Sequence, residues 1–157
     1  IMTAPVRPFC LYFAKFCVVA KMAVLTQAWL LVLFVFGGKC GATLPGFPPP
    51  EIVLWLLRGV IGGLAIIALQ LLLSMVIRNF ALPVLIALGG SVAGMLAVSE
   101  DLGLYWPYSL MILGMNSNRT EDVMAGGIWG FFLSCAVFLT VFLLIANVLL
   151  TKRDVKA

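Results

Sequence analysis

The sequence has 157 residues, the size of one domain, but its composition is far from that of a soluble domain. Apolar residues make up 64% and charged residues only 10%, so there is too little polar surface to cover a fold in water. This excludes disorder, nucleic-acid binding and an ordinary soluble enzyme, and it makes lipid the expected solvent. The net charge of +4 must then be interpreted from the positions of the charges.

The chain begins with a segment of mixed character at residues 2–15, where turn-forming residues precede aromatic and basic ones. This mixture predicts an interfacial helix that lies on the membrane surface before the chain enters the bilayer. The first predicted transmembrane helix covers residues 16–37 and carries one charge, Lys21, in its first turns. A loop follows, because three consecutive prolines at residues 48–50 cannot all be helical.

Three more stretches, residues 52–77, 80–98 and 125–150, reach the roughly 20 apolar residues that cross a bilayer. Residues 99–124 form a longer connection, either extracellular or re-entrant. Strands of membrane barrels alternate polar and apolar residues, and no such alternation appears. The predicted fold class is therefore all-α, a polytopic bundle of four transmembrane helices in a single membrane domain.

Four spans place both ends of the chain on one side of the membrane. Seven of the ten basic residues fall on that side, whereas five of the six acidic residues fall on the other. The basic residues expected on the same side of the membrane as the termini are Arg7, Lys15, Lys21, Arg78, Lys152, Arg153 and Lys156. The positive-inside rule therefore predicts cytoplasmic termini, and the excess charge reflects topology. The aromatic residues of the outer connection, Tyr105, Trp106 and Tyr108, are expected to anchor it at the headgroup level.

No catalytic or metal-binding constellation appears in the sequence. Histidine is absent, the four cysteines are not clustered, and there is no phosphate-binding GxxxxGK[ST] motif. The outer carboxylates are interpreted as solvated loop residues. We therefore expect no enzyme activity, no metal and no cofactor in this chain itself.

Polar residues within the predicted spans are few, and each needs protein or water around it. Gln70 and Ser74 share one helix face, and Asn147 lies in the inner half of the last span. These three either line a path or form hydrogen bonds between helices. Arg58 lies about two turns from Glu51 and is expected to reach outward to the surface, with no site assigned to it.

Glycines recur four residues apart in three of the spans, which gives helix faces that a neighbouring backbone can approach closely. They predict packing within the bundle or at a subunit interface. The pairs are Gly59 and Gly63, Gly90 and Gly94, and Gly126 and Gly130.

Several motifs along the chain resemble the permeases of type-2 ABC exporters. APV at residues 4–6 with LYFAK at 11–15 is similar to the run before the third helix of those permeases. LQLLLSMVIRNFA at residues 69–81 and YWPYS at 105–109 resemble the lantibiotic-immunity and bacitracin-resistance exporters in particular.

This resemblance implies a permease with six helices, of which this chain supplies the last four while the first two precede it. It implies that residues 2–15 end a coupling element that rests on a separate ATPase subunit. The coupling residues would be Pro5, Val6, Arg7, Tyr12 and Lys15. ATP and Mg would bind the partner subunit, and a second permease copy or a related permease would complete the pathway.

The resemblance also implies a location in the bacterial cytoplasmic membrane, in contact with lipid. The implied function is export of an amphipathic peptide, antibiotic or lipid-like molecule, which includes antibiotic resistance. Two alternatives remain open. One is a small four-helix membrane protein that acts as an assembly partner or as a binding-type immunity protein. The other is a fragment of a secondary transporter, although it lacks the intramembrane charges that such proteins show.

Overall fold

The computed structural model describes residues 8–41, 50–117, 122, 124 and 127–154. The described chain is helical, and four of its helices are long and apolar enough to cross a membrane, as predicted. Helix α1 spans Pro8–Cys40, α2 spans Glu51–Val76, α3 spans Ala81–Ser99 and α5 spans Trp129–Asp154. Two short elements, the 3-10 helix η1 (Gly103–Tyr105) and helix α4 (Ser109–Gly114), lie between α3 and α5.

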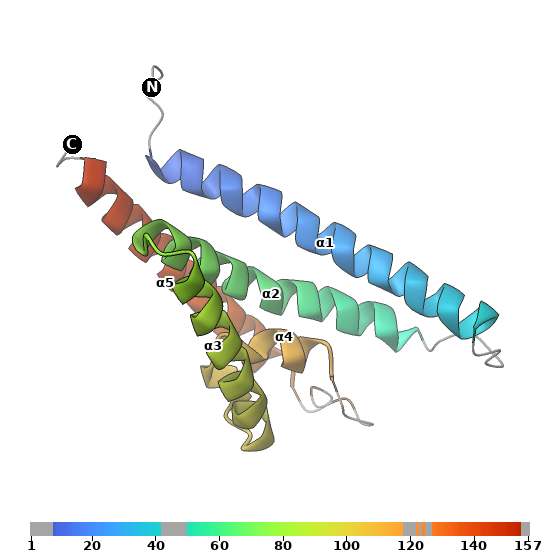
Figure 1. Ribbon diagram of the computed structural model, residues 1–157. Coiled ribbons are helices and arrows are strands. Elements are labelled where there is room, and N and C mark those ends of the chain that lie inside the picture. The colour runs from blue at the N-terminus through green and yellow to red at the C-terminus, as the bar shows by residue number, and fades with distance from the viewer. Residues whose placement is uncertain (1–7, 42–49, 118–121, 123, 125–126, 155–157) are drawn as a thin grey trace.

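Helices α1 and α2 run antiparallel and lie side by side, whereas α3 leaves the end of α2 at a steep angle (Figure 1). The start of α1, the α2–α3 junction and the end of α5 all lie near one end of the bundle (Figure 1). Tyr12, Leu72 and Ala146 form a buried cluster there that joins α1, α2 and α5. An even number of long helices separates these three points along the chain, which is the arrangement expected from the distribution of the charges.

The junction between α2 and α3 is short, and residues within it form hydrogen bonds with backbone groups at both helix ends. The N–H of Ile77 still donates to the carbonyl of Leu73, after which Ile77 adopts an extended conformation. The side-chain oxygen of Asn79 accepts from the N–H of Ala81 at 3.0 Å and so satisfies a donor in the first turn of α3. Pro83 is tolerated in that same turn, where an N–H would have no helical partner.

The first helix differs from its prediction. Instead of a surface helix over residues 2–15 followed by a span, α1 continues without interruption from Pro8 to Cys40. Phe9 already packs against the cluster that contains Leu72 and Ala146. The beginning of α1 therefore extends along α2 and α5, because its aromatic side chains are buried against them.

Candidate functional site

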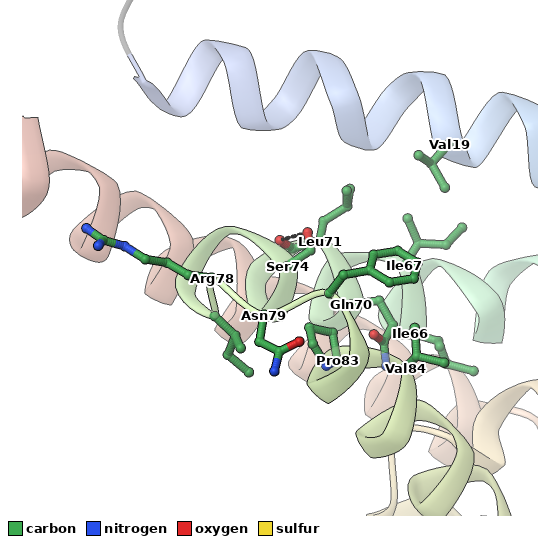
Figure 2. A pocket seen from close by; sticks show the side chains of 12 residues that line it. Val19, Ile66, Ile67, Gln70, Leu71, Ser74, Arg78, Asn79, Pro83 and Val84 are labelled. Atoms are coloured by element: carbon green, nitrogen blue, oxygen red, sulfur yellow. Dashed lines mark hydrogen bonds between the residues drawn. The ribbon is translucent and has the colours of Figure 1, made fainter.

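A cavity of about 480 Å³ lies between α1, α2 and α3, near the junction of α2 and α3. Its walls are mostly aliphatic, with Val19 from α1, Ile67 from α2 and Val84 from α3 among them (Figure 2). Its polar lining residues are Gln70, Ser74, Arg78 and Asn79. The volume falls within the range of about 300–1,000 Å³ that is usual for small-molecule sites.

The structure brings two of the three predicted path residues together at this cavity. Gln70 and Ser74 both line it, and the Ser74 hydroxyl donates to the carbonyl of Leu71 at 2.8 Å (Figure 2). Asn147 is exposed on α5 and does not line this cavity. Arg78 extends away from Gln70 and Val84 in Figure 2, so its charge lies at the rim.

Gln70 also forms a hydrogen bond between separate parts of the chain. Its side-chain N–H donates to the Tyr108 hydroxyl at 2.6 Å, and Tyr108 is only 5% exposed. Tyr108 is therefore buried in the bundle, which corrects the expectation that it anchors the connection at the headgroup level. Because the cavity and this hydrogen bond share Gln70, a change at the cavity can act directly on the connection that contains Tyr108.

The connection after α3 folds back into the bundle. The indole N–H of Trp106 donates to the carbonyl of Gly90 at 2.9 Å. Gly90 lies nine residues before Ser99, the end of α3, which corresponds to about 13 Å along the helix axis. The described part of the connection therefore folds back along α3, and protein covers its irregular backbone there.

Glycines on α3 allow this approach. A Cβ atom on Gly90 would lie 2.5 Å from the Tyr108 ring, and one on Gly94 would lie 3.1 Å from the backbone nitrogen of Ser109. The small-residue face predicted on α3 therefore receives the start of α4 in place of another long helix.

On α2 the glycine that permits the closest approach is Gly62, whereas Gly63 was predicted. A Cβ on Gly62 would lie 2.5 Å from the carbonyl oxygen of Leu110 in α4, whereas one on Gly63 would have nothing within 4 Å. Gly59 faces the side chain of Met115. The spacing that matters is thus three residues, because α4 crosses α2 along the Gly59–Gly62 row.

The third glycine pair is only partly described. A Cβ on Gly130 would come no closer than 3.7 Å to Leu104, which is ordinary contact. Gly126 lies outside the described residues.

A partly buried ion pair fixes the far end of the connection, and the sequence analysis did not predict it. Arg58 is 8% exposed, and one of its guanidinium nitrogens lies 2.9 Å and 3.1 Å from the two carboxylate oxygens of Asp122. Arg58 was expected to reach outward, and Asp122 to be solvated. One signal in the sequence could have indicated the pair, since a lone arginine in an apolar span needs a protein partner.

Asp122 is held in its charged form by two groups. The backbone N–H of Met124 donates to its carboxylate at 3.0 Å, and the Arg58 guanidinium lies on its other side. Together they lower the pKa of Asp122 below its ordinary value, although partial burial opposes them.

The predicted coupling residues occupy different environments. Tyr12 is fully buried and its hydroxyl donates to the carbonyl of Ala68 at 2.8 Å, so its position is that of a packing residue between α1 and α2. Lys15 is exposed. Pro5, Val6 and Arg7 lie outside the described residues. No face of the Tyr12 side chain is exposed, and its coupling role stays a prediction.

Within the described ranges there is no group of three or more His, Cys, Asp or Glu residues that could hold a metal ion. The described cysteines form no disulfide bonds. Cys135 is buried in the same apolar cluster as Phe131, where it acts as a packing residue.

Comparison with known proteins identifies the family. The sequence model of the ABC-2 family transporter proteins matches residues 1–94, which is more than half of the chain. No curated protein and no solved structure matches the chain. The matched region includes α1, α2 and most of α3, and thus the elements that line the cavity. The chain is a multi-pass membrane protein of the ABC-2 transporter family, in which it represents the membrane permease component of an ABC transporter.

Proposed function

We propose that this chain is the permease subunit of an ATP-driven exporter that moves an amphipathic molecule out of the membrane or the cell. The observation that carries the proposal is the cavity between α1, α2 and α3. Its aliphatic walls suit a hydrocarbon or apolar side-chain surface, and Gln70, Ser74 and Asn79 offer polar groups at the same site. A peptide, antibiotic or lipid-like molecule has both of these characters.

Energy for the movement would come from a separate ATPase subunit that binds ATP and Mg, since such subunits normally accompany permeases of this family. Arg7 and Lys15, near the cytoplasmic end of α1, would contact that subunit. A second permease copy or a related permease would complete the pathway. The location would be the bacterial cytoplasmic membrane, and the motifs at residues 69–81 and 105–109 favour a role in lantibiotic immunity or bacitracin resistance.

The bundle also has a feature that conformational change requires. The short helix α4 packs closely against α2 and α3. Polar contacts flank it, the Gln70–Tyr108 hydrogen bond before its start and the Arg58–Asp122 ion pair beyond its end. Closely packed interfaces tend to have discrete alternative arrangements, which a motor can bias. Transport would then involve repacking of α2 and α3 around α4.

A matched pair of tryptophan substitutions on α3 tests the cavity as the path. Val84 lines the cavity and is 51% exposed, while Val92 is 54% exposed and is not among the lining residues. In vesicles containing the whole transporter, Val84→Trp should lower substrate efflux at least tenfold by filling the cavity. Val92→Trp should leave efflux within about twofold of the unmodified protein. Equal efflux from both variants, with equal amounts of inserted protein, would rule out the cavity as the path.

A further inference from the structure

The antiparallel pairing of α1 with α2 shows which part of α2 lies beside each part of α1. Val19 lines the same cavity as Ile66 and Ile67, and Gln27 lines a second cavity with Ile52 and Leu56. Because the two helices are antiparallel (Figure 1), the residues between Val19 and Gln27 lie beside the part of α2 between Leu56 and Ile66.

Lys21 is one of these residues. It lies two positions after Val19, so it is level with a point about 12 residues from either end of α2, or ~18 Å along the axis. Its side chain is exposed on the face of α1 that α2 and α5 leave uncovered. A lysine stem reaches about 6 Å, which is much shorter than this distance, so the ammonium stays beside the middle part of α2.

Lys15 provides the contrast. It lies between Tyr12, which bonds Ala68, and Val19, and is therefore level with the last turns of α2. That position is about 10 Å from the end of the helix, so that bending of the stem brings its ammonium close to the membrane surface. The position of Lys21 therefore sets it apart from the other basic residues at the start of α1. It corrects the expectation that Lys21 lies in the first turns on the side of the termini, which leaves six of the ten basic residues on that side.

No group in the described part of the chain neutralises Lys21. The described acidic residues lie at the ends of the long helices or in the connection, at Glu51, Glu100, Asp101, Asp122 and Asp154. Asp122 is already paired with Arg58. Intramembrane lysines that persist in proteins face a protein partner or a water-filled space, because a charge in hydrocarbon is strongly unfavourable.

We propose that the face of α1 around Lys21 packs against a further transmembrane helix that presents a carboxylate at mid-depth and is none of α1, α2, α3 or α5. Charge complementarity selects this occupant over lipid. A second copy of the described helices cannot fill the role, since none of them carries an acidic residue at that depth. A transported molecule cannot fill it either, because it would leave Lys21 uncovered between turnovers.

The apolar surroundings of Lys21 agree with a helix interface. Val18 and Leu25, three residues before and four residues after it, share its face and are 58% and 53% exposed. An approaching helix would bury these side chains and surround the ion pair with them, which excludes water and strengthens the attraction between the charges.

Photo-crosslinking in native membranes tests this proposal with the whole transporter present. A photoreactive residue replaces Leu25, one turn from Lys21, and in a control chain it replaces Leu88, which is 64% exposed on α3. We expect a discrete protein adduct from position 25, with the crosslinked peptide in an apolar segment that contains Asp or Glu. Position 88 should give mainly lipid adducts.

Substitutions at Lys21 then test the charge. Lys21→Met should lower the yield of the adduct at least fivefold, Lys21→Arg should retain it, and Lys21→Glu should lose it. The adduct should return when the acidic residue of the partner segment is replaced by lysine in the Lys21→Glu chain, a rescue that a misfolded variant cannot show. Lipid adducts alone at position 25, an adduct segment without an acidic residue, or a yield unaffected by Lys21→Met would each overturn the proposal. Because these readouts do not measure transport, they stand apart from the test of the cavity.

Discussion

Arg58 and Asp122 join the middle of the chain to its last connection, with 2.9 Å between a guanidinium nitrogen and a carboxylate oxygen. The pair spans 64 positions in the sequence and lies beside the Gly59–Met115 contact. It therefore holds the connection against α2 near the point where α4 ends.

Removing either charge should destabilise the protein. Arg58→Met leaves the Asp122 carboxylate without its cation, and Asp122→Asn leaves a buried guanidinium unpaired, so each should cost about 1–3 kcal/mol. Thermal unfolding in detergent measures the loss. The exchanged pair, Arg58→Asp with Asp122→Arg, should recover part of it, and additive losses in this cycle would show that the pair contributes nothing.

The lowered pKa of Asp122 predicts a specific pH dependence. Its carboxylate is favoured in the folded state, so its contribution to stability is present above about pH 4 and is lost as the pH falls through the lowered pKa. The difference in melting temperature between the unmodified protein and Asp122→Asn should be constant from about pH 5 to pH 8 and should shrink below about pH 4. A difference that instead changes near pH 7 would contradict this assignment.

The close approach of α4 to α2 predicts unequal effects at adjacent glycines. Gly62→Ala places a Cβ 2.5 Å from the carbonyl oxygen of Leu110, whereas Gly63→Ala meets open space. The first substitution should destabilise by about 1–3 kcal/mol through overpacking. The second should be neutral or slightly stabilising, since alanine is the better helix former. Melting temperatures of the two variants in the same detergent decide the question, and equal values would mean that α4 does not pack here.

The hydrogen bond between Gln70 and Tyr108 should contribute modestly to stability but more to transport. Tyr108→Phe removes only the hydroxyl, and hydrogen bonds between membrane helices contribute about 0.6 kcal/mol on average. Efflux should fall further than this loss of stability explains, because Gln70 belongs to both the cavity and the bond. Measuring efflux and unfolding on the same preparation separates the two, and unchanged efflux would remove the bond from the mechanism.

Charge reversal at Arg7 and Lys15 should weaken the link to the ATPase while leaving membrane insertion intact. The expected loss is in the stimulation of ATP hydrolysis by the transported molecule. Tyr12→Phe is the comparison, since Tyr12 is buried and should affect stability alone. Unchanged stimulation in the Arg7→Glu, Lys15→Glu chain would count against a coupling role for these residues.

Some features of this protein follow from the sequence, because they depend on local composition. Four long apolar stretches predict four spans, and the prolines at residues 48–50 predict the break after the first. The start of α1 could not be predicted, because Tyr12 resembles an interfacial aromatic until Ala68 and Ala146 are placed beside it. Its burial depends on neighbours more than 50 positions away.

The connection shows the same limit. Residues 105–109 contain the polar aromatic residues typical of the membrane surface, yet Tyr108 is buried because Gly90 offers it space on α3. Glycine spacing alone did not distinguish Gly62 from Gly63, since which of them is approached depends on how α4 crosses α2. Arg58 and Asp122 could be singled out individually, but only the fold pairs them.

Co-purification from native membranes tests the central claim most directly. The chain is tagged, extracted in mild detergent at its natural expression level, and the accompanying subunits are identified and counted. If it is the permease of an ATP-driven exporter, a nucleotide-binding subunit should co-purify in fixed ratio and hydrolyse ATP in the complex. A chain that purifies without a nucleotide-binding subunit, while remaining folded and inserted, would contradict the account and favour a four-helix membrane protein that acts by binding alone.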